Sequence, residues 1–191
     1  MDESLQPPHT VPLTTLPSEG LIIDIGAGGE GLVSRFAGRR VCAVDIRIDE
    51  IREARIHGAP ADWFVSDGRH LCFRDRVFDI ATLWFSLAFM RDDETKLAVL
   101  NEAYRVLREN GILSIMATHV DGTRHRHLFR ALFEFPDGTL SQIGYGVLGT
   151  QRQDIESVCE LVSRAGFEVT ATEDHDAWFV ISAVKRSEST D

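Results

Sequence analysis

The sequence predicts an α/β protein whose core is a doubly wound, mostly parallel sheet of seven strands. From Leu21 onward, apolar runs of strand length alternate with stretches of helical periodicity. These runs are almost continuously apolar, which is typical of parallel strands covered by helices on both faces. A glycine-rich segment directly follows the first run, at the place where open α/β sheets bind ligands.

Strands and helices alternate regularly in the N-terminal half. The apolar run at 21–25 is followed by a helical stretch at 29–37, whose apolar residues share one face and which Gly38 ends. Further strands are predicted at 41–46, 63–66 and 79–85, and a further helix at 49–57.

The clearest helical pattern covers 94–108, because Leu97, Leu100 and Leu107 recur at helical spacing. Asn110-Gly111 is expected to end this helix, and a fifth strand is predicted at 112–117. These elements continue the alternation that predicts the parallel part of the sheet.

The C-terminal third has a different pattern. Two strand-like runs, 128–135 and 139–147, flank Pro136-Asp137-Gly138 and predict a β-hairpin. A helix is predicted at 154–165. The runs 167–173 and 177–185 are joined by so short a polar turn that they must form an antiparallel pair.

The 191 residues are expected to form a single domain. Four of the six prolines lie in residues 1–20, which therefore form an extended arm that is either disordered or lies across the domain as a lid. The domain itself is placed at 21–187, with the hairpin inserted at about 121–150 and a tail at 188–191.

Composition excludes several classes of function. With 30 acidic and 20 basic residues the formal net charge is −10, which disfavours unspecific binding of nucleic acid or an anionic membrane. The three cysteines, Cys42, Cys72 and Cys159, show no C-x-x-C spacing, so neither a disulfide framework nor a metal site is expected. No signal peptide or membrane-spanning run is recognised. We therefore expect a cytoplasmic protein, either a monomer or a homodimer.

The segment Asp24-Ile25-Gly26-Ala27-Gly28-Gly29-Glu30-Gly31 lies between a predicted strand and a predicted helix. Glycines there allow a tight turn and a close approach of a ligand to the backbone. Asp45 ends the next strand, where a carboxylate can accept hydrogen bonds from ribose hydroxyls. The spacing also fits an NAD-dependent oxidoreductase, but the carboxylates of Asp24 and Glu30 disfavour a pyrophosphate at this helix N-terminus.

Five ordered stretches resemble the motifs of class I S-adenosylmethionine-dependent methyltransferases, in particular the small-molecule, methyltransferase-11-like branch, and so imply a Rossmann-like fold. These stretches are 21–31, 41–45, 66–67, 78–86 and 106–115. The resemblance implies S-adenosylmethionine as the cofactor and methyl transfer to a small-molecule acceptor, by positioning and exclusion of water. A non-catalytic cofactor-binding module with the same fold stays an open alternative.

The resemblance also implies roles for individual residues. Asp24 and Gly26, Ala27 and Gly28 would hold the methionine part of the cofactor, and Asp45 the ribose. Ile46 would lie beside the adenine. Asp67, together with a backbone N–H of Gly68 or Arg69, would bind the adenine edge, and Leu83 and Trp84 would line the sulfonium.

Residues beyond the cofactor motifs give less defined indications. Related sequences often carry a histidine soon after the fourth strand, but here the stretch is Leu87-Ala88-Phe89-Met90. His119, after the fifth strand, is a candidate general base. Tyr145 either faces the acceptor or packs within the hairpin, and Phe85 is expected in the core. A basic cluster could bind an acidic substrate or form a solvated edge; it comprises Arg124, His125, Arg126, His127 and Arg130.

Overall fold

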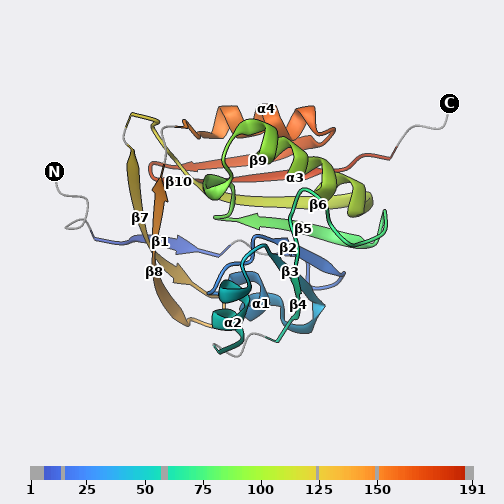
Figure 1. Cartoon of the computed structure of the whole chain (residues 1–191), viewed down its shortest axis with the longest axis horizontal. Helices are drawn as coiled ribbons and strands as arrows, with labels where there is room; N and C mark the ends of the chain where they lie inside the picture. Colours follow the sequence, from blue (N-terminus) through green and yellow to red (C-terminus); the bar gives the residue numbers. More distant parts are fainter. Residues whose placement is uncertain (1–6, 14–15, 57–59, 124, 149–150, 188–191) are drawn as a thin grey trace.

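A seven-stranded sheet runs through the centre of the molecule (Figure 1). The computed structural model describes residues 7–13, 16–56, 60–123, 125–148 and 151–187. In spatial order the strands of this sheet are β4 (Asp62–Val65), β3 (Val41–Asp45), β2 (Ile22–Ile25), β5 (Phe78–Trp84), β6 (Leu107–Thr118), β10 (Trp178–Val184) and β9 (Glu168–His175).

Strand direction confirms the mostly parallel sheet. β2 pairs in parallel with both β3 and β5, and the pairs β3–β4 and β5–β6 are parallel as well. β10 is antiparallel to both of its neighbours, β6 and β9, so it is the one reversed strand of this sheet. The predicted C-terminal antiparallel pair is therefore confirmed. The parallel strands all present their carboxyl ends at one edge, where ligands of this fold class bind.

Helices cover both faces of the sheet, as expected of a doubly wound fold. α3 (Asp93–Val106) and α4 (Ile155–Arg164) lie together on one face, whereas α1 (Leu32–Ala37), with α2 (Ile48–Ile56) beside it, lies on the other (Figure 1). Asp92 caps α3 by accepting a hydrogen bond from the Thr95 N–H at 2.8 Å. Two short 3-10 helices, Gly38–Arg40 and Leu87–Phe89, connect the larger elements.

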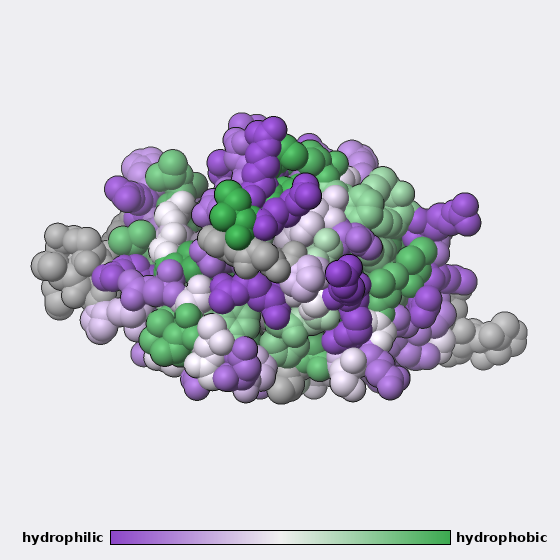
Figure 2. Space-filling model, turned by 90° about the horizontal axis from the view of Figure 1, so that it is seen from below, coloured by the Kyte–Doolittle hydropathy of each residue, from purple (hydrophilic) through white to green (hydrophobic). Residues whose placement is uncertain are grey.

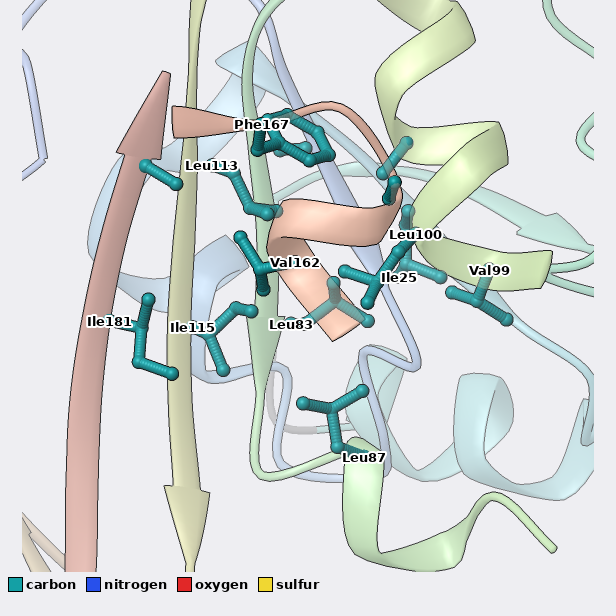
Figure 3. Close-up of a cluster of buried hydrophobic side chains, with 14 of the residues drawn as sticks. Ile25, Leu83, Leu87, Val99, Leu100, Leu113, Ile115, Val162, Phe167 and Ile181 are labelled. Carbon is teal, nitrogen blue, oxygen red and sulfur yellow. The ribbon is translucent and has the colours of Figure 1, made fainter. Parts of the chain in front are cut away.

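The apolar core forms two layers, one on each face of the sheet. Leu83 and Ile115 of the strands meet Leu100 of α3 and Val162 of α4 in the first layer (Figure 3). In the second layer, Ile80 and its neighbours meet α1 and a smaller sheet. Burial of both faces explains why the strand sequences are almost continuously apolar.

The smaller sheet has three strands, β1 (His9–Pro12), β7 (Arg126–Glu134) and β8 (Leu140–Leu148). β7 and β8 are antiparallel, which confirms the predicted hairpin, and β1 pairs in parallel with β7. Val11 is fully buried and Leu13 nearly so, both in the second core layer. This described part of the N-terminal arm is therefore packed into the fold. Residues 1–6 of the arm and the tail 188–191 lie outside the described residues.

The boundary between α3 and β6 differs from the prediction. The helix ends at Val106 and the strand begins at Leu107, so Asn110-Gly111 lies inside the strand and does not end the helix. The register with β5 shifts between the pairs Phe78–Leu107 and Ile80–Ile112. The extra residues form an irregularity of the strand, and Asn110, with a φ of 62°, supplies the turn that its sequence signal had indicated.

No helix within the described ranges is long and apolar enough to cross a membrane. The face of the molecule seen in Figure 2 carries hydrophilic side chains spread between smaller hydrophobic areas. Among the large apolar side chains that remain exposed, Ile46 at 64% and Phe89 at 56% both line a cleft at the carboxyl edge of the sheet.

Candidate active site

The cleft at the carboxyl edge of the parallel strands has a volume of about 810 Å³. Its walls come from the loops after β2, β3, β4 and β5, and from β8 of the smaller sheet. Most of the site residues predicted from the sequence line it, namely Gly26, Ala27, Gly28, Asp45, Ile46, Asp67, Gly68, Arg69, Trp84 and Tyr145.

The glycine loop after β2 is held against β3, because the N–H groups of Gly26 and Ala27 both donate to the Val44 carbonyl, at 2.8 and 3.1 Å. Gly28 has a φ of 60°, and a Cβ at this position would meet nothing within 4 Å. The loop backbone therefore faces open space where a ligand can approach it.

Carboxylates already accept from the donors of this loop. Asp45 Oδ2 accepts from the Gly28 N–H at 3.0 Å, and its Oδ1 accepts from the Arg47 N–H at 2.8 Å. Glu50 Oε2 accepts from the Gly29 N–H at 2.8 Å. An anionic pyrophosphate would have to displace these carboxylates, whereas a cationic ligand would be attracted by them.

Asp24 lies beneath the loop and not on the wall of the cleft. Its side chain is buried, and its Oδ1 accepts from the Thr82 hydroxyl at 2.7 Å. Burial raises the pKa of Asp24 to about 7; the Thr82 hydrogen bond opposes this shift, and the neighbouring Asp45 carboxylate adds to it. Asp24 can therefore influence the cleft only through its charge and through the loop above it.

Leu83 does not line the cleft, in contrast to the expectation from the sequence. It points into the core layer beneath α3 and α4, beside Ile115 (Figure 3). Trp84, the next residue, points to the opposite face, lines the cleft and donates from its indole N–H to Ser114 Oγ at 3.1 Å. Successive residues of a strand face opposite sides, so only one of the two can reach the site.

Two cleft residues after β5 were not predicted as site residues. Phe85 is buried, as expected, but it also lines the cleft and has a φ of 59°, an unusual backbone conformation for a bulky residue. Ser86 Oγ is buried without a hydrogen-bond partner among the described residues. The sequence signal for both was their position directly after a central parallel strand.

Tyr145 combines the two positions expected for it, because its side chain both packs against neighbouring rings and faces the cleft. Its ring packs against Phe85 and Phe133, and it also lines the cleft. Burial, and then the carboxylates of Glu30, Asp24 and Glu50, raise the pKa of its hydroxyl above the ordinary value. The hydroxyl therefore stays protonated at neutral pH.

Asp67 and Arg69 form a tight pair at the adenine end predicted for the cleft. The Arg69 side chain reaches Asp67 Oδ2 at 2.6 Å, and its backbone N–H donates to Oδ1 at 2.9 Å. These hydrogen bonds lower the pKa of Asp67. Since the Arg69 N–H is already bonded to Asp67, Gly68 is the better placed of the two residues for a contact to a ligand ring.

His119 lies outside the cleft. Its Nε2 is 2.8 Å from Asp174 Oδ1 on β9, and its ring packs against Phe179 of β10. The basic cluster is also away from the cleft lining in its described part; His125 and Arg126 are exposed, and Arg124 lies outside the described residues. No group of three potential metal-ligating side chains is found within the described ranges.

A family model described as a methyltransferase domain matches residues 23–115, which include the glycine loop, Asp45, Asp67 and the segment after β5. The chain belongs to the class I S-adenosylmethionine-dependent methyltransferases. Its enzymatic activity is accordingly methyl transfer, and its cofactor is S-adenosylmethionine. No sequence match to this methyltransferase is found among curated proteins.

Solved structures share the fold of this methyltransferase over most of its length. An S-adenosylmethionine-dependent methyltransferase from Methanosarcina mazei is 21% identical with a TM-score of 0.67, covering 91% of this chain and 95% of its own. One from Mesorhizobium loti is 15% identical with a TM-score of 0.63, covering 86% and 90%. A glycopeptide N-methyltransferase complexed with S-adenosylhomocysteine is 14% identical with a TM-score of 0.63, covering 88% and 84%.

The residues of the cleft fit the cofactor of the methyltransferase. The open backbone at Gly28 and the unpartnered Ser86 Oγ suit a polar ligand, and the exposed Ile46 offers an apolar surface to a flat base. The carboxylates of Asp45 and Glu50, which accept hydrogen bonds from the loop, suit a ligand that carries an ammonium and a sulfonium charge. The oxidoreductase alternative finds no support, because the same carboxylates oppose a pyrophosphate.

Proposed function

We propose that this methyltransferase acts on a small-molecule acceptor. The observation that carries the proposal is a second cavity of about 570 Å³, which adjoins the cofactor cleft and shares four of its lining residues. This volume lies within the range of small-molecule sites. The shared residues are Phe89, Met90, Arg91 and Gly146.

In the cofactor cleft, the proposed roles follow the geometry. Asp45 keeps free lone pairs beside its two backbone hydrogen bonds and would accept from the ribose hydroxyls. Ile46 would cover the adenine, and Asp67 with Gly68 would bind its edge. Gly26, Ala27 and Gly28 would line the methionine part, with the buried Asp24 beneath the loop.

S-adenosylmethionine, when bound, would supply a methyl group bonded to a positively charged sulfur, and attack of an acceptor lone pair on the methyl carbon would break the carbon–sulfur bond and release a neutral thioether. The chain has to align the acceptor and exclude water. Phe85, Phe89 and Tyr145 form an aromatic wall of the cofactor cleft, and Phe89 lines the second cavity as well, so these rings suit the second task. Trp84 would line the reacting end of the cleft.

The described residues offer no general base at the junction of the two cavities. His119 lines neither cavity, and the raised pKa of the Tyr145 hydroxyl prevents it from accepting a proton at neutral pH. We therefore propose that the acceptor reacts through a lone pair it already carries, or loses its proton to water, and that positioning supplies the rate enhancement.

Methyl-labelled S-adenosylmethionine, incubated with the protein and a cell extract, tests this proposal. The extract is separated by ultrafiltration and nuclease treatment into small-molecule, protein and nucleic-acid fractions. We expect a labelled compound other than S-adenosylmethionine in the small-molecule fraction, and less of it with an Asp45→Ala variant when the cofactor is subsaturating. Label that enters only the protein or nucleic-acid fraction would contradict a small-molecule acceptor.

A further inference from the structure

The second cavity, which we call the acceptor cavity, contains a buried charged side chain whose ion-pair partner is largely exposed. Lys96 lines the cavity and is only 2% exposed. Within the described residues, its one ion pair is with Asp93, from Nζ to Oδ1 at 3.6 Å, and the Asp93 side chain is 56% exposed. Asp92 is also near, but its carboxylate already caps α3.

The position of Lys96 is unfavourable for a cation in two respects. It lies in the first turns of the 14-residue helix α3, where the partial positive charge of the helix N-terminus repels an ammonium group. It is also desolvated, and this burial lowers the pKa of its side chain. Residues that break local rules in this way are most often found at functional sites.

The only other lysine of the chain shows what a structural role involves. Lys185 is also buried, but its Nζ donates to the carbonyls of Tyr104 and Leu107, at 2.8 and 2.9 Å, and lies over the Tyr104 ring. Lys185 thus joins the end of α3 to the sheet. Lys96 makes no comparable backbone contacts among the described residues.

Unpaired acceptors line the same cavity. Gln153 is 1% exposed, and its amide N–H donates to the Thr118 carbonyl at 2.8 Å, which leaves Oε1 buried without a donor among the described residues. Its backbone is fixed by two hydrogen bonds to Val120, both at 2.8 Å. Gln151 Oε1, also at this cavity, is buried and unpartnered as well. A buried oxygen without a donor is unfavourable, and a ligand that brings an N–H or O–H group relieves that cost.

We propose that the acceptor cavity binds a small carboxylic acid that also carries an N–H or O–H group. The carboxylate pairs with Lys96, the donor group meets Gln153 Oε1, and the apolar body lies against Met90, Val120 and Val147. This proposal rests on the proposed function, because it names the acceptor class of the same reaction. A buried ammonium and a buried carboxylate compensate each other, whereas a neutral ligand would leave Lys96 with only its ion pair to the partly exposed Asp93.

Matched acid and amide probes test the charge requirement. The protein is labelled with a carbon isotope at lysine Cε, which gives one NMR signal for Lys96 and one for Lys185, assigned with the variant Lys96→Met. Meta- and para-aminobenzoate and the corresponding aminobenzamides are titrated with and without saturating S-adenosylhomocysteine. We expect the acids to shift the Lys96 signal and leave the Lys185 signal in place. We also expect the amides to bind at least about tenfold more weakly.

Two variants separate the parts of the proposed site. Lys96→Met should remove the preference for acids over amides without lowering the melting temperature, since an apolar side chain of similar length replaces a buried charge. Gln153→Leu should remove the preference for aminobenzoate over benzoate. Equal binding of acids and amides, or no Lys96 shift with any probe up to about 10 mM, would overturn the proposal. Calorimetric titration with S-adenosylhomocysteine, together with the label-transfer experiment, reports on the proposed function separately from these signals.

Discussion

The ring of Phe85 stacks on the ring of Tyr145, with the centroids 5.6 Å apart and the planes inclined by 9°. Phe85 also stacks on Phe129 at 5.5 Å, and Phe129 on His9 at 5.6 Å. A row of four rings thus leads from the N-terminal arm to the cofactor cleft. The backbone of Phe85, which has a positive φ, donates its N–H to the Met116 carbonyl at 2.6 Å. This hydrogen bond and the stacked neighbouring rings together hold Phe85 in place in the wall of the cleft.

Because the Tyr145 hydroxyl stays protonated, Tyr145→Phe should retain its activity. We expect kcat and kcat/KM within about threefold of the wild type, whereas loss of a general base would cost about a hundredfold or more. The pH profile of kcat should also stay unchanged between pH 6 and pH 9, in the range where burial keeps the hydroxyl neutral. A large loss of kcat at unchanged KM would assign the hydroxyl a role in the reaction.

Asp45→Ala should weaken binding of S-adenosylhomocysteine by about 1.5–3 kcal/mol, the range for a hydrogen bond that involves a charged group. The variant also removes the hydrogen bond that the Gly28 N–H donates to Asp45 Oδ2 at 3.0 Å. Isothermal titration calorimetry measures the affinity. Asp49→Ala is the control, because this carboxylate on α2 is 74% exposed and should leave the affinity unchanged. Equal affinity of the two variants would remove Asp45 from the cofactor site.

Gly28→Val should abolish the ligand-induced rise of the melting temperature, because the side chain would fill the space in front of the loop. Gly138→Val is a matched control, since Gly138 in the hairpin turn also has a positive φ and open space at its Cβ. Both variants place a valine at a positive φ, 60° at Gly28 and 82° at Gly138, but only Gly28 lines the cleft. A normal shift of Gly28→Val with S-adenosylhomocysteine would refute the role of the loop.

The pKa of Asp24, raised to about 7, predicts a pH-dependent stability. Between about pH 4 and pH 7 the native state holds a proton that the unfolded state releases, so the free energy of unfolding falls as the pH rises through this window. Relative to the wild type, Asp24→Asn should be more stable by about 1.5 kcal/mol at pH 5 and by at most about 4 kcal/mol at pH 8. Urea unfolding at both pH values tests this, with Asp49→Asn as the exposed control. A variant less stable than the wild type at pH 8 would contradict a desolvated carboxylate.

Val11→Ala should destabilise the protein by about 2 kcal/mol, because the Val11 side chain of β1 is fully buried in the second core layer. Thr10→Ala on the same strand is the control, since Thr10 is exposed. Deletion of residues 1–17 should lower the melting temperature further, so a loss of turnover in that truncation has to be compared with its folded fraction. Unchanged unfolding of Val11→Ala would show that the arm is dispensable for the fold.

Periodicity and glycine signals were sufficient to predict the seven strands and the hairpin, but not which residues face the site. Leu83 and Trp84 are both apolar and the sheet is covered on both faces, so no alternation indicates which of them points to the cleft. The Asn110-Gly111 signal marks a turn, but only the pairing of Leu107 with Phe78 shows that the strand has already begun.

The smaller sheet and the acceptor cavity depend on contacts that are distant in sequence. β1 is four residues long and ends in a proline, and its partner strand lies in the second half of the chain. His119 follows its strand as predicted, but its side chain turns to Asp174, away from both cavities. Lys96 looks like an ordinary helix residue until the packing around it buries it.

The parallel pairing of β1 with β7 has a consequence for the order of folding. His9 pairs with Ala131 and Pro12 with Glu134, so the arm leaves the ribosome long before its partner strand exists. Until the hairpin is synthesised, Val11 and Leu13 have no layer to enter and stay accessible to chaperones and proteases. The docking of the arm therefore closes one of the most non-local contacts of the chain, and protection of its amides from hydrogen exchange should develop among the last in a refolding experiment.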